Sequence, residues 1–547
     1  MPPSFDVRLD DLTGARAESR EAAQDSDSIL AGPPSELGVN KSPTRQNQRY
    51  GDDASPTRHS PAKVARRAGS QGYSPPQPWA PTAKAAGDGA SPARQSQHHG
   101  DGAWSTHPVL GDERTFYIET FGCQMNVHDS EKVAGVLLGR GYQQVETVDA
   151  AKLVFYNTCS IREKAAQKVF SRLGEYRTKQ AAGQVIGVLG CVAQQEGEDI
   201  FARAPWVSLV CGSASYRKLP ELLARVEAGD QRVTGLDNDT DETFETPVTR
   251  RDNPWRAYLT IIEGCDKACA YCVVPFTRGP ERSRASDSVL KEVRELANLG
   301  YSEVQLLGQT VNSYADPSSR RMRFSELLLA VADVQGMRRV RFTTSHPRDF
   351  GADIVAALES EPKLCNHVHL PVQSGSTRVL REMVRTYTRE EYLEKIAMLR
   401  QATRPIAITT DIIVGFPGET EADFGETLTL LEEVRYDNMF SFKYSARPNT
   451  PSLAMPDAIS EEEKSQRLRI LQEKQREIQG EHNAKLVNTT FDVLVSGKSR
   501  RENHWSGHTS CHRVINFTSQ ERNLLGTYVR VQATGAGPNS LVGEQVT

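Results

Sequence analysis

From residue 113 onward the sequence alternates short apolar runs with amphipathic segments, and this alternation limits the possible folds more than any other feature. In the first series, apolar runs at 115–122, 153–159, 185–191 and 207–212 are separated by helical patterns such as 127–140 and 162–180. Apolar runs that alternate with helices in this way are typical of parallel βαβ units. We therefore expect an α/β domain with a parallel sheet over residues 113–230.

A second alternating series predicts the central domain, over residues 250–482. Its expected strands are 257–264, 303–308, 338–344, 367–372, 406–414 and 438–444, with helices such as 287–299 and 421–435 between them. Six strands over about 190 residues are fewer than the eight of a full α/β barrel, so we expect a partial (β/α)6 barrel. Residues 460–487 predict one charged helix with a Ser460/Glu463 capping box, docked through Leu468, Leu471 and Ile478.

The two ends of the chain differ from this pattern. Short strands at 491–497, 512–517 and 528–534 with Gly-rich turns predict a small β-barrel over 484–547. Residues 1–112 hold only 11 Leu, Ile, Val and Phe but 13 of the 29 prolines, a composition that predicts a disordered tail. The N-terminus has no secretory signal pattern, and no apolar run is long enough to span a bilayer. We expect a cytoplasmic protein that does not enter the membrane.

Charge and cysteine content narrow the function classes. The net charge of −4 excludes a wholly basic nucleic-acid coat, although it allows a local basic surface. Nine cysteines are few for 547 residues and odd in number, which argues against a disulfide scaffold. Cys265, Cys269 and Cys272 form a C-x3-C-x2-C cluster directly after a predicted strand. Structural zinc sites use four ligands, and no fourth is near; three thiolates on an iron–sulfur cubane would leave one iron open for a cofactor.

Three further cysteines each end a predicted strand of the first domain. Cys123, Cys159 and Cys191 are 36 and 32 residues apart, one for each βα repeat. The ends of parallel strands share one edge of a sheet, so these thiols could converge on a ligand. They could also be unrelated buried thiols. Because Cys211 is placed similarly, the spacing alone does not select three of the four.

The C-x3-C-x2-C motif, with Tyr271 before its last cysteine, resembles the radical S-adenosylmethionine (SAM) superfamily. The segments ETFGCQMNVHDSE, YNTCSIREKA and GCVAQ resemble the N-terminal domain of the methylthiotransferase family within it. The resemblance implies a 4Fe–4S cluster on Cys265, Cys269 and Cys272 that binds SAM and cleaves it with one electron. It implies a second 4Fe–4S cluster on Cys123, Cys159 and Cys191 that supplies sulfur.

Gln124-Met125 distinguishes the branches of that family. The ribosomal-protein branch has Pro-Lys here and the threonylcarbamoyladenosine branch has Lys-Val, whereas this chain resembles the branch that acts on a tRNA. The implied reaction is methylthiolation at C2 of an N6-dimethylallyladenosine beside the anticodon. The implied partners are the tRNA anticodon arm and an electron donor, with the protein acting as a monomer. A sibling methylthiotransferase and a non-catalytic iron–sulfur RNA-binding protein remain alternatives.

Motifs after several central strands are candidates for SAM contact. They are GQTVNSY, HLPVQSGS and GFPGET, and their candidate residues are Gln309, Asn312, Gln373, Ser374, Gly415 and Gly418. Arg385 is a candidate for the SAM carboxylate or, alternatively, a solvated helix charge. His367 and His369 alternate on a strand, so we expect one of them to face the core, and neither needs to be a ligand.

The C-terminal barrel resembles the TRAM RNA-binding module. Its expected RNA surface combines basic and aromatic side chains, namely Lys498, Arg500, Arg501, Arg513, Arg522, Arg530, Trp505 and Phe517. The family usually has an arginine where this chain has His508. Cys211, Cys365 and Cys511 match no ligand position of the family and are expected to be structural.

Overall fold

The protein is represented by a computed structural model that describes residues 114–161, 163–179, 183–237, 251, 253–499 and 504–546. The predicted tail, Arg500 and Arg501 lie outside these ranges.

The first domain is built on one parallel sheet. The six strands lie in the order β2-β1-β3-β4-β5-β6. Their bounds are β1 Thr115–Phe121, β2 Gln143–Gln144, β3 Leu153–Thr158, β4 Val185–Gly190, β5 Leu209–Cys211 and β6 Val233–Gly235. Every neighbouring pair is parallel. The four predicted strands are confirmed, and the very short β2 and β6 were not foreseen.

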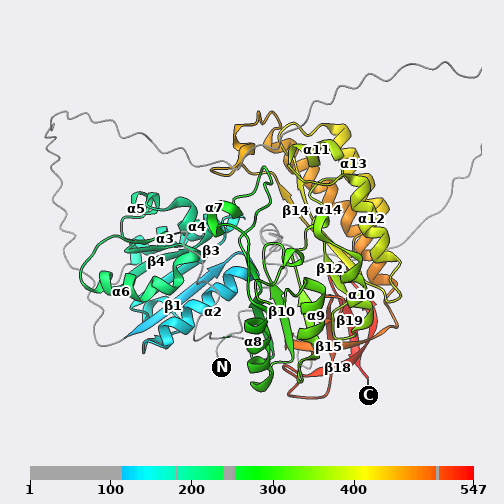
Figure 1. Cartoon of the computed structure of the whole chain (residues 1–547), viewed down its shortest axis with the longest axis horizontal. Helices are drawn as coiled ribbons and strands as arrows, with labels where there is room; N and C mark the ends of the chain where they lie inside the picture. The colour runs from blue at the N-terminus through cyan, green and yellow to red at the C-terminus, as the bar shows by residue number, and fades with distance from the viewer. Residues whose placement is uncertain are drawn as a thin grey trace, which may run out of the picture. The chain divides into compact units, whose positions relative to one another are not determined.

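Helices cover both faces of this sheet, as the coiled ribbons beside β1, β3 and β4 show (Figure 1). They are α2 Gln124–Leu138, α3 Glu163–Lys179, α4 Cys191–Glu196, α5 Asp199–Arg203 and α6 Leu219–Glu227. All residues of β3 and β4 are buried, since side chains on one face pack under α2 and α6 and those on the other under α3 to α5. Burial on both faces explains the unbroken apolar runs from which these strands were predicted.

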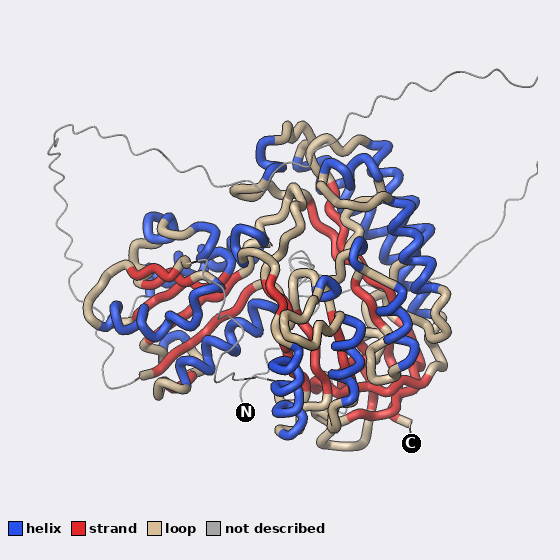
Figure 2. The backbone as a smooth tube through the Cα atoms, viewed as in Figure 1, coloured by secondary structure: helices blue, strands red, loops and turns tan. Residues whose placement is uncertain are grey.

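The central domain has the six parallel strands that the sequence predicts. Two three-stranded sheets, β11-β10-β7 and β12-β13-β14, meet where Val340 pairs in parallel with Leu364. The strands are β7 Arg256–Thr260, β10 Glu303–Leu307, β11 Arg339–Phe342, β12 His367–His369, β13 Ala407–Val414 and β14 Asn438–Lys443. Between them lie α8 Ser286–Asn298, α9 Phe324–Asp333, α10 Ala352–Ser360, α11 Thr377–Glu382, α12 Arg389–Arg400 and α13 Glu421–Val434. Strands and outer helices are separated by colour in Figure 2.

The long helix α14, Glu461–Ala484, closes this domain against β14 and α13. Leu471 and Ile478 are fully buried and Leu468 packs beside them, which confirms the predicted docking stripe. Only half of the predicted capping box forms. The Ser460 hydroxyl accepts the Glu463 N–H at 3.1 Å, but the Glu463 carboxylate turns to Arg467 instead of the N-cap backbone. No described helix combines the length and apolarity needed to cross a bilayer.

The C-terminal residues form a closed five-stranded barrel in the order β15-β16-β17-β19-β18. Its strands are β15 Thr490–Lys498, β16 His504–Thr509, β17 Val514–Thr518, β18 Tyr528–Ala536 and β19 Leu541–Gln545. The sequence predicted three of them. β16, which reads HWSGHT, was missed because glycine and histidine interrupt its apolar alternation. The short β19 was also missed.

Candidate functional site

The Cys265–Cys272 segment is a compact loop between two short elements, β8 (Ile262–Glu263) and α7 (Val274–Arg278). The Ala270 N–H donates to the carbonyl of Met383 at 3.0 Å, and the Cys272 N–H donates to the carbonyl of Cys269 at 3.1 Å. Cys265 and Cys269 are each 8% exposed. The loop therefore holds two of its three thiols with little access to water, while Cys272 is partly exposed.

Burial raises the pKa of the Cys272 thiol to about 12 and that of Cys265 to about 11, and in each case the neighbouring Cys269 adds to the effect. Thiols in such surroundings ionise when a cationic metal centre is bound, which fits a cluster site made only of sulfur donors. In the described ranges, no group of three or more Cys, His, Asp or Glu side chains is already gathered in metal-binding geometry. The ligand assignment therefore stays a prediction.

Arg385 lies beside this loop and is not a solvated helix charge. Its Nη1 donates to Cys269 Sγ at 3.3 Å, its Nε to the Tyr387 hydroxyl at 2.9 Å and its Nη2 to the carbonyl of Pro371 at 3.2 Å. The Arg385 side chain is 8% exposed. Tyr271 is also at this place, where burial raises its pKa and Arg385 acts in the opposite direction. A fixed buried cation next to the loop suits an anionic group such as the SAM carboxylate.

The two candidates of GQTVNSY have different surroundings. Gln309 Oε1 is buried and has no hydrogen-bond partner among the described residues. An unsatisfied buried acceptor is costly, so this atom is suited to a ligand donor. Asn312 is fully engaged, because its amide donates to the His346 carbonyl at 2.9 Å and its oxygen accepts the His346 N–H at 2.7 Å. Asn312 therefore positions backbone, and direct contact with SAM stays a prediction.

Gln373 and Ser374 follow β12 in the HLPVQSGS segment. Gln373 has a φ of 75° and its main chain bridges to β13, with its N–H bonded to the Asp411 carbonyl at 2.9 Å. Ser374 is 1% exposed, and its hydroxyl accepts the N–H of Ser376 at 3.2 Å. The left-handed backbone of a non-glycine residue marks a turn that the surrounding structure enforces, as is common next to ligand sites.

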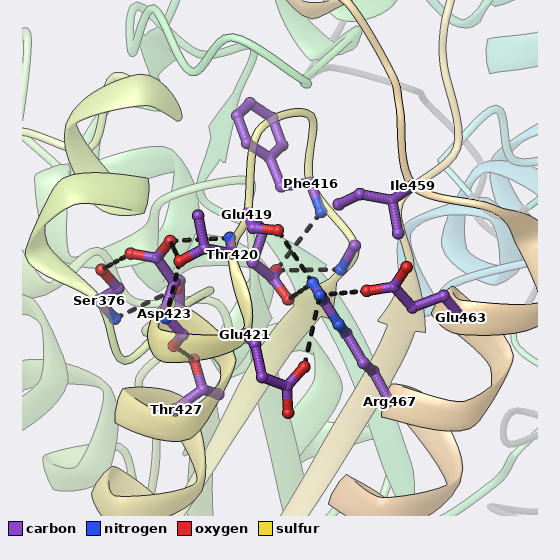
Figure 3. A network of polar contacts seen from close by, with 12 residues as sticks. Ser376, Phe416, Glu419, Thr420, Glu421, Asp423, Thr427, Ile459, Glu463 and Arg467 are labelled. Carbon is purple, nitrogen blue, oxygen red and sulfur yellow. Dashed lines mark hydrogen bonds and ion pairs between the residues drawn. The ribbon is translucent and has the colours of Figure 1, made fainter.

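The GFPGET turn is clamped by carboxylates, as Figure 3 shows. Glu419 accepts the N–H groups of Gly415 and Phe416 at 3.0 and 3.4 Å, and its other oxygen pairs with Arg467 of α14 at 2.9 Å. Gly415 (φ 72°) is covered, since a Cβ there would lie 2.4 Å from Lys464 Cγ, whereas a Cβ on Gly418 would meet nothing within 4 Å. Of the two glycines, Gly418 is the one with open space beside its Cα, and its carbonyl accepts from Arg378 Nη2 at 2.6 Å.

The three strand-end cysteines of the first domain follow neighbouring strands at one edge of the sheet. In the register of the sheet, Phe121 pairs with Thr158 and Thr158 with Gly190, so the residues that follow β1, β3 and β4 are neighbours. A Cβ on Gly122 would lie 2.3 Å from the Cβ of Cys159. The pKa of Cys159 is held well above its usual value by a hydrogen bond with Cys123, by burial and by the nearby Cys191. This sulfur-only group fits a second cluster site.

Cys211 is separated from this triad by register. It is the last residue of β5 and pairs with Leu189, two residues before Cys191, and its buried thiol packs in the apolar cluster under α2 and α6. The two other cysteines outside the triads lie elsewhere. Cys365 is buried after α10, and Cys511 accepts from Arg513 Nη1 at 3.6 Å in the C-terminal barrel.

Contacts link the two residues after Cys123 to the strands of the central domain. Gln305 of β10 donates to the Gln124 side chain at 2.9 Å, and the Thr260 hydroxyl lies 4.0 Å from the sulfur of Met125. The Gln124-Met125 pair that follows Cys123 therefore touches the strands of the central domain. The structure thus brings one edge of the first sheet to the central domain near its cysteine loop.

The prediction for the two histidines of β12 was wrong. His367 Nε2 and His369 Nδ1 both lie 2.9 Å from the Thr409 hydroxyl, so both side chains are buried on the same face. Residues i and i+2 of a strand point the same way, so both histidines lie on one face of the sheet.

The expected RNA surface of the C-terminal barrel also needs correction. Trp505 and Phe517 are 3% and 0% exposed and belong to the barrel core. Arg513 is bound to Asp437 at 2.5 Å and Asn483 at 3.0 Å, against the central domain. His508 lies at this same boundary, where Arg339 and Arg341 donate to the carbonyls of 508, 509 and 510. Lys498, Arg522 and Arg530 are exposed and stay candidates for RNA contact.

Arg278 is the residue at this site that the sequence analysis missed. It ends α7, and its Nη2 donates to Asp129 Oδ2 of α2 at 2.6 Å, with both side chains almost fully buried. Burial raises the pKa of the Cys191 thiol, and the Arg278 guanidinium acts against this increase. The only sequence signal was its place six residues after Cys272.

Three segments of the chain match known families. Residues 115–212 match the uncharacterized protein family UPF0004, residues 259–431 the radical SAM superfamily, and residues 484–546 the TRAM domain. Among solved structures, the radical S-adenosylmethionine methyltransferase TsrM from Kitasatospora setae is similar at a TM-score of 0.46, with 14% identity over 62% of this chain and 74% of that one.

Curated relatives match over almost their whole length. The tRNA-2-methylthio-N(6)-dimethylallyladenosine synthase of Solibacter usitatus is 63% identical, covering 79% of this chain and 98% of the relative. That of Koribacter versatilis is 60% identical over 80% and 100%, and that of Aquifex aeolicus is 44% identical over 79% and 98%. The chain therefore belongs to the tRNA-2-methylthio-N(6)-dimethylallyladenosine synthase family of radical SAM enzymes.

Proposed function

We propose that this enzyme methylthiolates C2 of N6-dimethylallyladenosine beside the anticodon of tRNA, with one 4Fe–4S cluster on each cysteine triad. The observation that supports the proposal is the placement of six cysteines in two separate sets of three, in adjoining α/β domains. One follows the ends of β1, β3 and β4, and the other lies between β8 and α7. The names of the relatives favour this substrate over those of the sibling enzymes.

The radical triad is proposed to be Cys265, Cys269 and Cys272. When bound there, a cluster with SAM supplies a 5′-deoxyadenosyl radical, while the cluster of the other triad supplies sulfur. The protein excludes water from the loop by burying Cys265 and Cys269. Arg385 offers a fixed cation beside Cys269, and the unpaired Gln309 oxygen offers an acceptor.

The remaining SAM contacts are proposed with different roles. Tyr271 shapes the loop next to Arg385, and Asn312 holds the backbone of His346. Gln373 and Ser374 form the enforced turn after β12, while Gly418 leaves open space beside its Cα and Gly415 fixes the turn against α14.

The C-terminal barrel is proposed to hold the anticodon arm. Support comes from the TRAM match at 484–546 and from the exposed Lys498, Arg522 and Arg530, which suit phosphate contacts. We further propose that the enzyme is a cytoplasmic monomer that takes electrons from a separate donor. Its barrel docks on its own central domain through Arg339 and Arg341.

Iron counting and product analysis test this proposal. Two clusters correspond to about eight irons per chain, and replacing Cys265, Cys269 and Cys272 with alanine should leave about four. Cys123→Ala should keep reductive SAM cleavage but abolish the methylthio nucleoside in tRNA digests. Full iron content in the triple variant, or normal product from Cys123→Ala, would show that the triads have been assigned wrongly.

A further inference from the structure

The sheet β12-β13-β14 has an inner face, turned away from the helices, that carries polar and aromatic side chains. On the outer face, Val368, Ile412 and Met439 pack in the core formed with helices α12 to α14, which lie outside these strands (Figure 1). Residues that alternate with them point to the inner face. These residues are His367, His369, Thr409, Asp411, Ile413, Asn438, Phe440 and Phe442. Such a composition suits a ligand surface better than an apolar core.

Asp411 lies on the central strand of this face and is partly open to water. Its side chain is 29% exposed, and its Oδ1 lies 3.4 Å from His369 Nε2. His369 is itself held in place, because its Nδ1 lies 2.9 Å from the Thr409 hydroxyl and its ring packs edge-on against Phe440, with centroids 5.9 Å apart. Within the described ranges, His369 is the only side chain in polar contact with the Asp411 carboxylate. A carboxylate fixed on one side and exposed on the other can accept a hydrogen bond from a ligand.

The register of the sheet places this carboxylate beside two aromatic side chains and close to the cysteine loop. Asp411 pairs with Phe440, and Ile413 pairs with Phe442. Both phenylalanines are partly exposed. Ile413 packs against the apolar cluster that contains Ala270 of the cysteine loop. Successive residues on one face of a strand are about 7 Å apart, so Asp411 and Phe440 lie one layer of side chains from that loop.

The inner face of the central domain also reaches the other set of cysteines. Val304 and Leu306 of β10 pack in the outer core, so Gln305 between them points inward. Its side chain donates to that of Gln124, the residue after Cys123, at 2.9 Å. The inner face is therefore in contact with both parts of the proposed active site.

We propose that this face binds the target base, with Asp411 accepting the N6–H of N6-dimethylallyladenosine and with Phe440 and Phe442 contacting its dimethylallyl group. The inference rests on the proposed function, because it assumes that substrate. The N6 nitrogen is a secondary amine, so a hydrogen-bond donor stands where an apolar branched group begins. A carboxylate beside two phenylalanines matches both features, whereas guanine presents an acceptor oxygen at this position, which a carboxylate repels. Because N6 and C2 belong to one rigid ring, holding N6 also fixes the direction of C2.

The test measures binding of three anticodon stem–loop RNAs to the full chain with reconstituted clusters. The RNAs differ only beside the anticodon, where they carry N6-dimethylallyladenosine, adenosine or purine riboside, which lacks the N6 amino group. Dissociation constants are measured anaerobically by fluorescence anisotropy for the parent, Asp411→Ala, Phe440→Ala and Phe442→Ala. Ser441→Ala is the control, because Ser441 of β14 faces outward and contacts Gln472 of α14.

The two kinds of variant should change different ratios. Asp411→Ala should weaken binding of the dimethylallyladenosine and adenosine RNAs about tenfold and leave the purine RNA unchanged, as expected for loss of a hydrogen bond to a charged acceptor. Phe440→Ala and Phe442→Ala should each reduce the preference for dimethylallyladenosine over adenosine by about tenfold. Ser441→Ala should bind all three RNAs as the parent does. Iron content shows whether each variant is folded and loaded.

The proposed function and this inference fail on different results. If the parent forms no methylthio nucleoside in the dimethylallyladenosine RNA, the proposed function fails. If the parent forms it but Asp411→Ala weakens all three RNAs alike, or none, the role of Asp411 is overturned. An unchanged preference in both phenylalanine variants overturns the contact with the dimethylallyl group. If a variant does not fold, the parent alone decides: equal affinity for the adenosine and purine RNAs refutes the N6 contact, and equal affinity for the dimethylallyladenosine and adenosine RNAs refutes the apolar contact.

Discussion

Gly122, the residue before Cys123, should tolerate no side chain because Cys159 occupies the space next to it. Its φ is 118°, and an added Cβ would lie 2.3 Å from the Cβ of Cys159 and 3.2 Å from its backbone nitrogen. Gly141, after α2, is a matched control with a φ of 82° and nothing within 4 Å of an added Cβ. Both Gly→Ala changes strain the backbone, but only the first displaces a proposed cluster ligand.

Backbone strain and steric overlap set the expected loss of stability in the two variants. A non-glycine residue at such a φ costs about 1–3 kcal/mol, which is the full expected effect of Gly141→Ala. In Gly122→Ala, overpacking against Cys159 adds about 1–3 kcal/mol, because two carbons cannot approach to 2.3 Å and one strand end must shift. We therefore expect the free energy of unfolding to fall about twice as much in Gly122→Ala as in Gly141→Ala.

Urea unfolding and iron analysis measure the two consequences. In the background lacking Cys265, Cys269 and Cys272, Gly122→Ala should lower the iron content from about four toward zero, whereas Gly141→Ala should retain about four. Equal urea midpoints and equal iron contents for the two variants would refute the close packing of Gly122 on Cys159 and the convergence that depends on it.

Three further predictions concern other parts of the chain. Trp505→Ala should lower the free energy of unfolding by about 3–5 kcal/mol because Trp505 is 3% exposed in the barrel core. Arg530→Ala should change the free energy of unfolding by no more than about 0.5 kcal/mol. It should weaken tRNA binding and reduce the salt dependence of that binding, as filter-binding titrations at several salt concentrations would reveal. Burial lowers the pKa of His508 to about 3, helped by Arg256 and Arg341. Between pH about 6.5 and about 3, the unfolded state therefore binds more protons than the folded state. The free energy of unfolding measured in urea should be lower at pH 5.5 than at pH 7.5, and this difference should be smaller in His508→Gln. Removal of residues 1–112 should leave soluble, active enzyme, since that segment lacks core-forming composition; loss of soluble expression would contradict this.

Much of the fold was predictable because its signals are local. Strands β3 and β4 are buried on both faces and so read as continuous apolar runs, and α8 and α13 lie within a residue or two of their predicted bounds. β2 and β6 have two and three residues, too few to show any period, and their pairing depends on neighbours distant in sequence. The pairing of β16 also depends on distant residues, since a Cβ on Gly507 would lie 2.5 Å from the carbonyl oxygen of Leu494 on β15.

The side chains of the C-terminal barrel show where composition misleads. Basic and aromatic residues close together in sequence suggested one RNA surface, yet Phe517 points into the barrel and Arg513 is held by Asp437 of the central domain. Alternation along β17 tells which residues share a face, but it does not tell whether that face meets water, the barrel interior or another domain. That distinction requires the docking of the barrel, which Arg339 and Arg341 determine from 150 or more residues away.

The sequence by itself determined which chemistry is available: a C-x3-C-x2-C loop after a strand, three strand-end cysteines, and the α/β alternation that puts them at sheet edges. Only the tertiary structure decided which residues meet. Spacing did not separate Cys211 from Cys159 and Cys191, but the pairing of Cys211 with Leu189 places it within the sheet, while Cys191 lies beyond the strand end. Arg278 has no sequence signature for its partner because Asp129 lies 149 residues earlier. Register and interdomain packing arise from many distant contacts acting together, and a one-dimensional pattern records only the neighbours along the chain.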